Sequence, residues 1–209
     1  PPSHKDGGFL LPGFRQQSGF ISQGRSMKRT LLALATTLAV LASADIAAKD
    51  ATAEAARIHE GALVLDTHLD TPANLRRPGW SIADDHRHEG ELSQVDLPRM
   101  KAGGLDGGFW VIYTAQGVRD EAGKRAARDH GLERLVSIRE MLAAHASDME
   151  LALTAADAER IASAGRRVSF ISMENAAPLA SDPSLLEVYY RLGLRMLGIT
   201  HVRNNEFGD

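Results

Sequence analysis

Short, continuously apolar runs alternate with longer segments of helical periodicity over residues 49–209. Four of these runs suit strands, because they are too short for core helices. We expect strands at residues 62–66, 107–113, 167–173 and 195–200. Strands that alternate with crossover helices form parallel sheets, and uninterrupted apolar runs fit strands buried on both faces. The pattern therefore predicts an α/β fold with a parallel sheet covered by helices.

The predicted helices lie between these strands and have recognisable ends. Apolar residues at helical spacing predict a long amphipathic helix at residues 123–146, after shorter helical segments at 49–60 and 96–103. Thr154 is a suitable N-cap for a helix that stops at Gly165. Asp182 and Pro183 suit the cap and first position of the next helix.

Residues 76–92 have no hydrophobic period and are rich in Pro, Gly, Asp and His. This composition predicts a long surface loop. We expect His86 and His88 to be solvated residues of that loop.

Polar residues interrupt the apolar pattern at one end of the predicted strands only. The first strand ends in Asp66, His68 and Asp70, the third in Glu174 and Asn175, and the fourth in Thr200 and His201. His68 and Asp70 are two residues apart on a strand, so we expect them to share a face. Active sites of parallel α/β proteins form at the shared carboxyl end of the strands. His68, Asp70 and Glu174 supply one imidazole and two carboxylates, which suit zinc or a similar divalent ion. We interpret His201 as a further site residue, whereas Asp66 is left unassigned, with the orientation of a metal ligand as one option.

Composition and charge narrow the chemistry. The chain has no cysteine, so any metal must be held by His, Asp or Glu, and thiol nucleophiles are excluded. The formal net charge of -3 and the scattered basic residues exclude the electrostatic footprint of a nucleic-acid-binding protein.

Residues 27–44 have the three-part pattern of a signal peptide. A basic start, an apolar core and a small-residue cleavage site follow in order. The uncharged part is shorter than the roughly 20 residues that span a bilayer, so we expect cleavage rather than a stable membrane anchor. The protein is then exported, to the periplasm or outside the cell. Residues 1–26 are expected to be upstream sequence outside the functional protein.

Four ordered blocks carry a resemblance to a known family. They read "LVLDTHLDTP", "LSQVDLPRMKAGGLDGGFWVIYT", "SFISMENAAPL" and "LLEVYYRLGLRMLGITHVRNNEFGD". From about Ile58 onward the chain resembles the renal or membrane dipeptidases, which are zinc metallopeptidases, and especially their bacterial branch. The resemblance implies a (β/α)₈ TIM-type barrel of the metal-dependent hydrolase kind. It also implies hydrolysis of the peptide bond of dipeptides by a hydroxide that bridges two zinc ions.

The resemblance assigns roles to four residues. It implies that His68 and Asp70 bind one zinc, that Glu174 bridges both, and that His201 contacts the substrate and stabilises the tetrahedral intermediate. The remaining ligands of the second zinc would lie beyond Asp209. A full barrel takes about 250 residues and eight strands. We therefore expect residues 45–209 to be the N-terminal half of a barrel, truncated after about four strands and inactive alone.

Two other functions stay open from the sequence. One is another binuclear amidohydrolase, such as a lactonase or a deacetylase. The other is a non-catalytic periplasmic protein with a degenerate barrel. The expected partner is a small dipeptide, and a homodimer is a further option.

Overall fold

The structure is a computed structural model that describes residues 49–88, 90–91 and 93–208. The chain divides into two compact units, residues 1–57 and 58–209. Residues 49–57 are helical, and the second unit contains the whole described sheet. The predicted upstream segment and signal peptide lie outside the described residues, so both remain predictions. Among the described helices, none combines the length and apolar character needed to cross a membrane.

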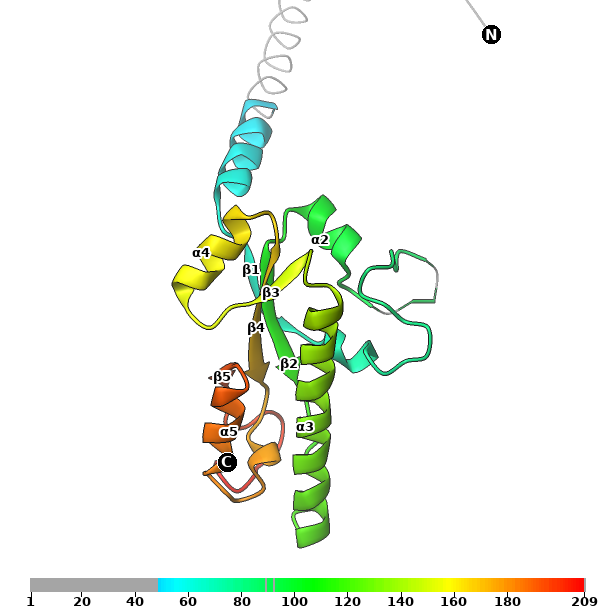
Figure 1. Cartoon of the computed structure of the whole chain (residues 1–209), viewed down its shortest axis with the longest axis vertical. Coiled ribbons are helices and arrows are strands. Elements are labelled where there is room, and N and C mark those ends of the chain that lie inside the picture. Colours follow the sequence, from blue (N-terminus) through cyan, green and yellow to red (C-terminus); the bar gives the residue numbers. More distant parts are fainter. Residues whose placement is uncertain (1–48, 89, 92, 209) are drawn as a thin grey trace, which may run out of the picture. The chain divides into compact units, whose positions relative to one another are not determined.

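A five-stranded parallel sheet forms the centre of the second unit (Figure 1). Its strands are β1 (Leu65–Leu69), β2 (Gly107–Ile112), β3 (Met149–Leu151), β4 (Arg167–Met173) and β5 (Leu194–Leu197). β1 pairs with β2, and β2 pairs with β4. On its other side β4 pairs with β3 over its first residues and with β5 over its last ones. The all-parallel pairing confirms the predicted α/β fold class.

The first strand begins three residues later than predicted. Its pairing with β2 starts at Leu65, opposite Gly107. Val64 is held instead by Asp106, whose side chain accepts from the Val64 N–H and whose N–H donates to the Val64 carbonyl, both at 2.9 Å. Asp66 and His68 lie within β1, which ends at Leu69, before Asp70. β3 was not predicted, because three residues are too few to show a period.

The helices are α2 (Leu97–Gly103), α3 (Glu121–Ala144), α4 (Ala155–Ser163) and α5 (Leu185–Arg191), with 3₁₀ helices η1 (Thr71–Asn74) and η2 (Ala177–Leu179). Thr154 caps α4 as predicted, in a capping box with Asp157. The C-cap of α2 is Gly104 rather than Gly103, because Gly104 takes the left-handed φ of 68°. α5 starts later than predicted, since Asp182 accepts from the Ser184 N–H at 2.9 Å and does not cap the helix.

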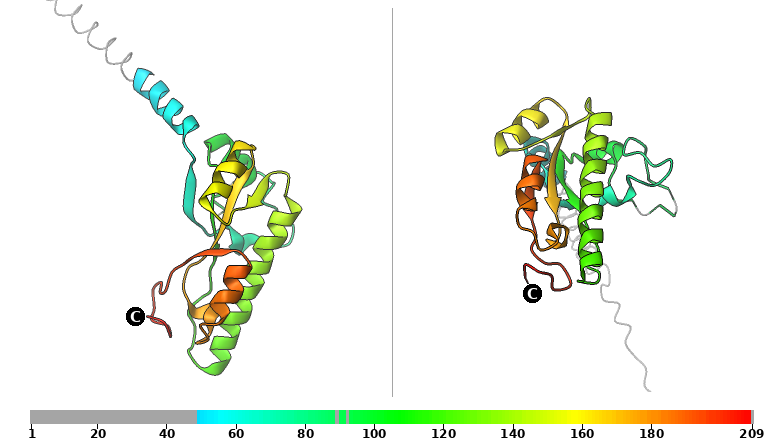
Figure 2. Two further views of the ribbon diagram at one scale, coloured as in Figure 1. Left: turned by 60° about the vertical axis from the view of Figure 1, so that its left-hand side comes forward. Right: turned by 60° about the horizontal axis from the view of Figure 1, so that its bottom comes forward.

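Different helices pack against the two faces of the sheet (Figures 1 and 2). Side chains alternate along β2, so neighbouring residues point to opposite faces. Trp110 packs in one buried cluster with Ile138 of α3. Phe109 stacks on Phe170 of β4, with ring centroids 4.8 Å apart, in a second cluster with Ile161 of α4. β2 and β4 are thereby covered on both faces, as central strands of a parallel sheet require, whereas Asp66, Thr67 and His68 of β1 are exposed.

α3 is held against η2 and α5 at a glycine. A Cβ added to Gly131 would lie 2.7 Å from the Pro178 Cβ and 2.8 Å from the Tyr189 hydroxyl. Tyr189 is fully buried, and this burial raises its pKa to about 12. Only a residue without a side chain allows this close approach.

We expect Gly131→Ala to destabilise the protein although alanine is the better helix former. Alanine gains about 1 kcal/mol of helix propensity, but overpacking costs roughly 1–3 kcal/mol, so the free energy of unfolding should fall by up to roughly 2 kcal/mol. Urea unfolding of the purified chain measures the change. Gly103→Ala is the control, because nothing lies within 4 Å of a Cβ there. Equal stability of both variants would contradict the packing argument.

Candidate metal centre

The structure brings the four predicted site residues together at the carboxyl ends of β1, β4 and β5. His68 lies in β1, Asp70 is the N-cap of η1, Glu174 follows β4 and His201 follows β5. The Nε2 atom of His68 lies 3.5 Å from Asp70 Oδ2 and 3.7 Å from Glu174 Oε2. The Nδ1 atom of His201 lies 2.8 Å from Glu174 Oε1. We call these four residues the strand-end cluster.

Glu174 is the centre of this cluster. Its side chain is 8% exposed, whereas those of His68 and His201 are 47% and 46% exposed. Its N–H donates to the Ile112 carbonyl at 3.2 Å, and a side chain at Gly198 would clash with its carbonyl oxygen. β2 and the end of β5 therefore fix its backbone. Buried charges in proteins are paired or coordinate metal ions. The buried Glu174 carboxylate, which lies between two imidazoles, fits either case.

Three of the four residues form a donor set that fits a divalent ion. One atom each of His68, Asp70 and Glu174 lies within 4.8 Å of the other two. Ligands at about 2.0–2.2 Å from one zinc are at most about 4.4 Å apart, so small side-chain movements would close the set. Asp70 reaches the cluster from outside the strand, with φ −78° and ψ 0°. The expectation that it shares a strand face with His68 was therefore wrong in detail.

Neighbouring residues hold the cluster in place. Asp66 accepts from the His68 backbone N–H at 2.8 Å, so it orients the chain rather than the imidazole. The Tyr113 ring meets the His201 ring edge-on, with centroids 6.5 Å apart. Asn175 is fully buried and donates to the Thr114 carbonyl at 2.9 Å.

The loop that carries His201 is attached to the loop after β2. Gln116 donates to the Arg203 carbonyl at 2.6 Å and accepts from the Arg203 N–H at 3.2 Å. Arg119 donates to Glu206 at 3.0 Å. The sequence carried no signal for these pairs, because 87 residues separate the partners in each.

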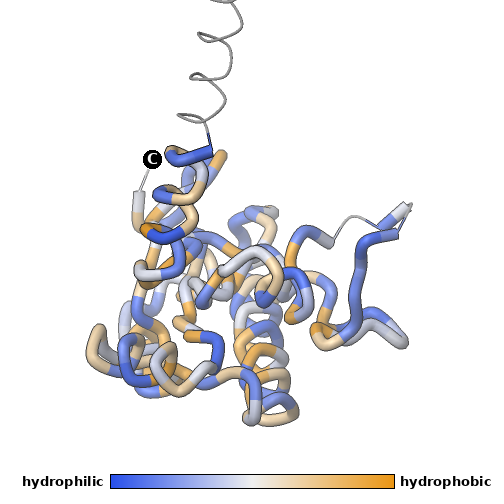
Figure 3. The backbone as a smooth tube through the Cα atoms, turned by 90° about the horizontal axis from the view of Figure 1, so that it is seen from above, coloured by the Kyte–Doolittle hydropathy of each residue, from blue (hydrophilic) through white to orange (hydrophobic). Residues whose placement is uncertain are grey.

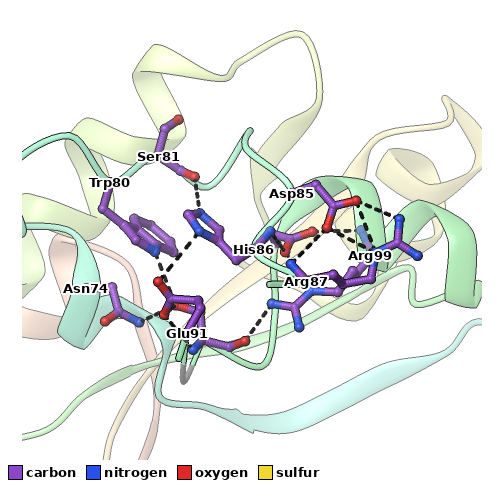
Figure 4. Close-up of polar contacts among 10 residues, drawn as sticks. Asn74, Trp80, Ser81, Asp85, His86, Arg87, Glu91 and Arg99 are labelled. Carbon is purple, nitrogen blue, oxygen red and sulfur yellow. Dashed lines mark hydrogen bonds and ion pairs between the residues drawn. The ribbon is translucent and has the colours of Figure 1, made fainter. Parts of the chain in front are cut away.

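The prediction that His86 is a solvated residue was wrong. His86 is 7% exposed and stacks on Trp80, with ring centroids 4.8 Å apart and planes 7° from parallel (Figure 4). His88 is exposed, as predicted. The surrounding loop is strongly hydrophilic (Figure 3), so periodicity could not reveal a buried ring within it. The Trp80 indole supplies the apolar surface, and its Nε1 donates to Ser93 at 3.1 Å.

Asp96 anchors this loop from inside. It is fully buried, accepts from the His86 N–H at 3.0 Å and from Arg99 Nε at 2.6 Å, and caps α2. Burial alone would raise the pKa of Asp96, but the hydrogen bonds from His86 and Arg99 outweigh it and lower the pKa. Arg99 also donates to the Ser93 carbonyl at 2.6 Å. One buried carboxylate therefore joins the middle of the loop to the start of α2.

We expect Arg99→Met to destabilise the loop by roughly 1–3 kcal/mol, because it removes the charged partner of a buried acceptor. Arg87→Met is the matched control. Its partner Asp85 also lies 2.6 Å away, but that pair is exposed. Hydrogen exchange of the amides at residues 81–99 measures local opening. A similar loss of protection in both variants would show that burial of Asp96 is not what holds the loop.

Comparison with known proteins places the chain in a family. A family model described as membrane dipeptidase (peptidase family M19) matches residues 52–209. Dipeptidase ataJ of Aspergillus terreus is 32% identical over 123 residues, which cover 56% of this chain and 30% of that protein. The chain spans roughly a third of the length of the curated relatives it matches.

Solved structures agree with the fold. The structure described as "the probable dipeptidase PvdM" of Pseudomonas aeruginosa has a TM-score of 0.64 and 24% identity, over 76% of this chain and 39% of that chain. A metallopeptidase of Rhodobacter sphaeroides, liganded with a phosphinate mimic of the dipeptide L-Ala-D-Ala, has a TM-score of 0.55 and 27% identity. That match covers 68% of this chain and 46% of that chain. Fungal and bacterial relatives both match, so the bacterial branch remains a prediction.

Proposed function

The chain belongs to the membrane dipeptidase family, peptidase family M19, and we propose that its strand-end cluster is part of a two-zinc site that hydrolyses dipeptides. One observation carries the proposal. The buried Glu174 has His68 at one carboxylate oxygen and His201 at the other. Each oxygen of this carboxylate faces a different histidine, so Glu174 is placed to connect the His68 side of the site with the His201 side.

Each residue of the strand-end cluster has a proposed task. His68, Asp70 and Glu174 would hold zinc, which when bound acts as a Lewis acid and lowers the pKa of a coordinated water toward about 7. The Nδ1 atom of His201 is 2.8 Å from Glu174 Oε1, which leaves Nε2 for the substrate. A protonated His201 can donate from Nε2 to a developing oxyanion, while Glu174 balances its charge. His201 is thus the substrate-contacting residue of the proposal.

Dipeptides are the proposed substrate class. The Rhodobacter sphaeroides relative holds a mimic of L-Ala-D-Ala, so this dipeptide is the first to test. We also propose export of the protein, on the strength of the signal pattern at residues 27–44.

Zinc binding is tested on the purified 209-residue chain. Asp70→Asn should lower zinc affinity at the strand-end cluster by at least about tenfold, because an amide oxygen replaces a charged ligand. Asp66→Asn is the matched control, since Asp66 bonds to the backbone of His68. Titration calorimetry gives both affinities. If Asp66→Asn weakens binding as much as Asp70→Asn, the assignment of ligands is wrong.

Activity is tested on the full-length gene product. Glu174→Gln should lower kcat/KM for L-Ala-D-Ala by at least about a hundredfold, and His201→Gln should lower it with the zinc content unchanged. Release of D-alanine is the measurement. Cleavage of lactones or acetylated amines in place of dipeptides would favour another amidohydrolase. We expect the 209-residue chain by itself to bind zinc without hydrolysing dipeptides.

A further inference from the structure

A second group of metal-ligating side chains lies outside the strand-end cluster. His86, His88 and Glu91 each offer one ligand atom, and these atoms lie within 4.8 Å of one another. We call them the loop cluster. All three come from the loop between η1 and α2, and none contributes to the strand-end cluster. The proposed dipeptidase function assigns them no task.

His86 is oriented as a metal ligand would be. Its Nε2 lies 2.8 Å from the Ser81 carbonyl, which can only accept, so this nitrogen carries the hydrogen (Figure 4). In the neutral ring, Nδ1 then keeps its lone pair. It faces Glu91 Oε2 at 3.9 Å, too far for a hydrogen bond. Metal-binding histidines commonly donate their other N–H to a backbone carbonyl in this way.

Burial and stacking fix the direction of the His86 Nδ1 atom. The His86 side chain is 8% exposed, and stacking on Trp80 prevents the ring from turning away. The Nδ1 atom of a buried, stacked ring is thus directed at a buried carboxylate. A cation between the two would be attracted by both groups.

Glu91 presents one oxygen to the same point. Its Oε1 accepts from the Ser93 N–H at 2.8 Å, from the Ser93 hydroxyl at 2.7 Å and from Arg77 at 3.1 Å. Among the residues that the structure describes, its Oε2 accepts from Arg77 at 3.2 Å and faces the His86 ring at 3.9 Å. Hydrogen bonds from Arg77 and Ser93 lower the pKa of Glu91, so it is ionised at neutral pH. One carboxylate oxygen is anchored and the other can still accept a ligand bond.

Arg77 is the competitor of a cation at this site. Its guanidinium forms the two hydrogen bonds to Glu91. Its side chain is 50% exposed, whereas that of Glu91 is 5% exposed. Arg77 can therefore swing into solvent when another cation takes its place beside the buried Glu91 carboxylate. A divalent ion would replace its single positive charge with two.

We propose that the loop cluster binds a zinc-like divalent cation through His86 Nδ1, His88 and Glu91 Oε2. Two imidazoles and one carboxylate suit zinc and its neighbours in the transition series better than calcium or magnesium. Three protein ligands leave a fourth position for water. The ion cross-links the loop, and Asn74 at the end of η1 joins it through a hydrogen bond to Ser93 at 3.2 Å.

The test uses the full 209-residue chain with Asp70→Asn and Glu174→Gln, so that the strand-end cluster contributes no strong site. This background separates the inference from the dipeptidase proposal, since either can fail alone. Zinc is titrated by calorimetry, and Co²⁺ absorption reports ligand geometry. We expect one zinc per chain. His88→Ala should weaken its binding by at least about tenfold.

Two further variants distinguish a metal site from a structural hydrogen-bond network. His130→Ala removes an exposed histidine of α3 and should leave zinc affinity unchanged. Arg77→Met removes the competing cation and should tighten zinc binding, which a purely structural role of Arg77 does not predict. The inference is overturned if the background protein binds no zinc. It is equally overturned if His88→Ala and His130→Ala behave alike, or if Arg77→Met leaves the affinity unchanged.

Discussion

The pairing of β4 on both sides is the constraint on which the rest of the second unit depends. Every residue of β4 except Arg167 is buried, and three other strands bond to it. Because its polar backbone must be satisfied without water, its neighbours fix its register. Glu174, which follows β4, is therefore delivered to one defined place. The adjacent carboxyl ends of β1 and β5 supply histidines there, so the candidate site is a consequence of the sheet.

Two groups of histidine and carboxylate residues coexist in this chain under different physical conditions. In the strand-end cluster the carboxylate is buried and the imidazoles are half exposed, a setting open to substrate. In the loop cluster one imidazole and the carboxylate are both buried, and Arg77 forms an ion pair with the carboxylate. We therefore propose different roles for these two groups of similar ligands. The open cluster suits chemistry, and the closed one suits a bound ion that stabilises a loop.

Much of the fold and of the candidate site could be predicted because the signals are local. β4 lies at its predicted bounds, and Thr154 caps α4 as expected. The convergence of His68, Glu174 and His201 followed from a general property of parallel sheets, whose carboxyl ends face one way. One error arose where a distant residue decides, because Asp106 delays the start of β1. The other is local, because the Asp182 carboxylate binds the N–H of Ser184, two residues on, instead of capping α5.

The sequence by itself determined four of the five strands, the long helix and which residue types meet at the carboxyl end of the sheet, since these depend on periodicity and on spacing along the chain. Only the tertiary structure decided the burial of His86. Its stacking on Trp80 and its bond to Asp96 involve residues that no hydrophobic period connects. Burial and the direction of a lone pair depend on what packs around a side chain. They become defined only when the loop closes on itself.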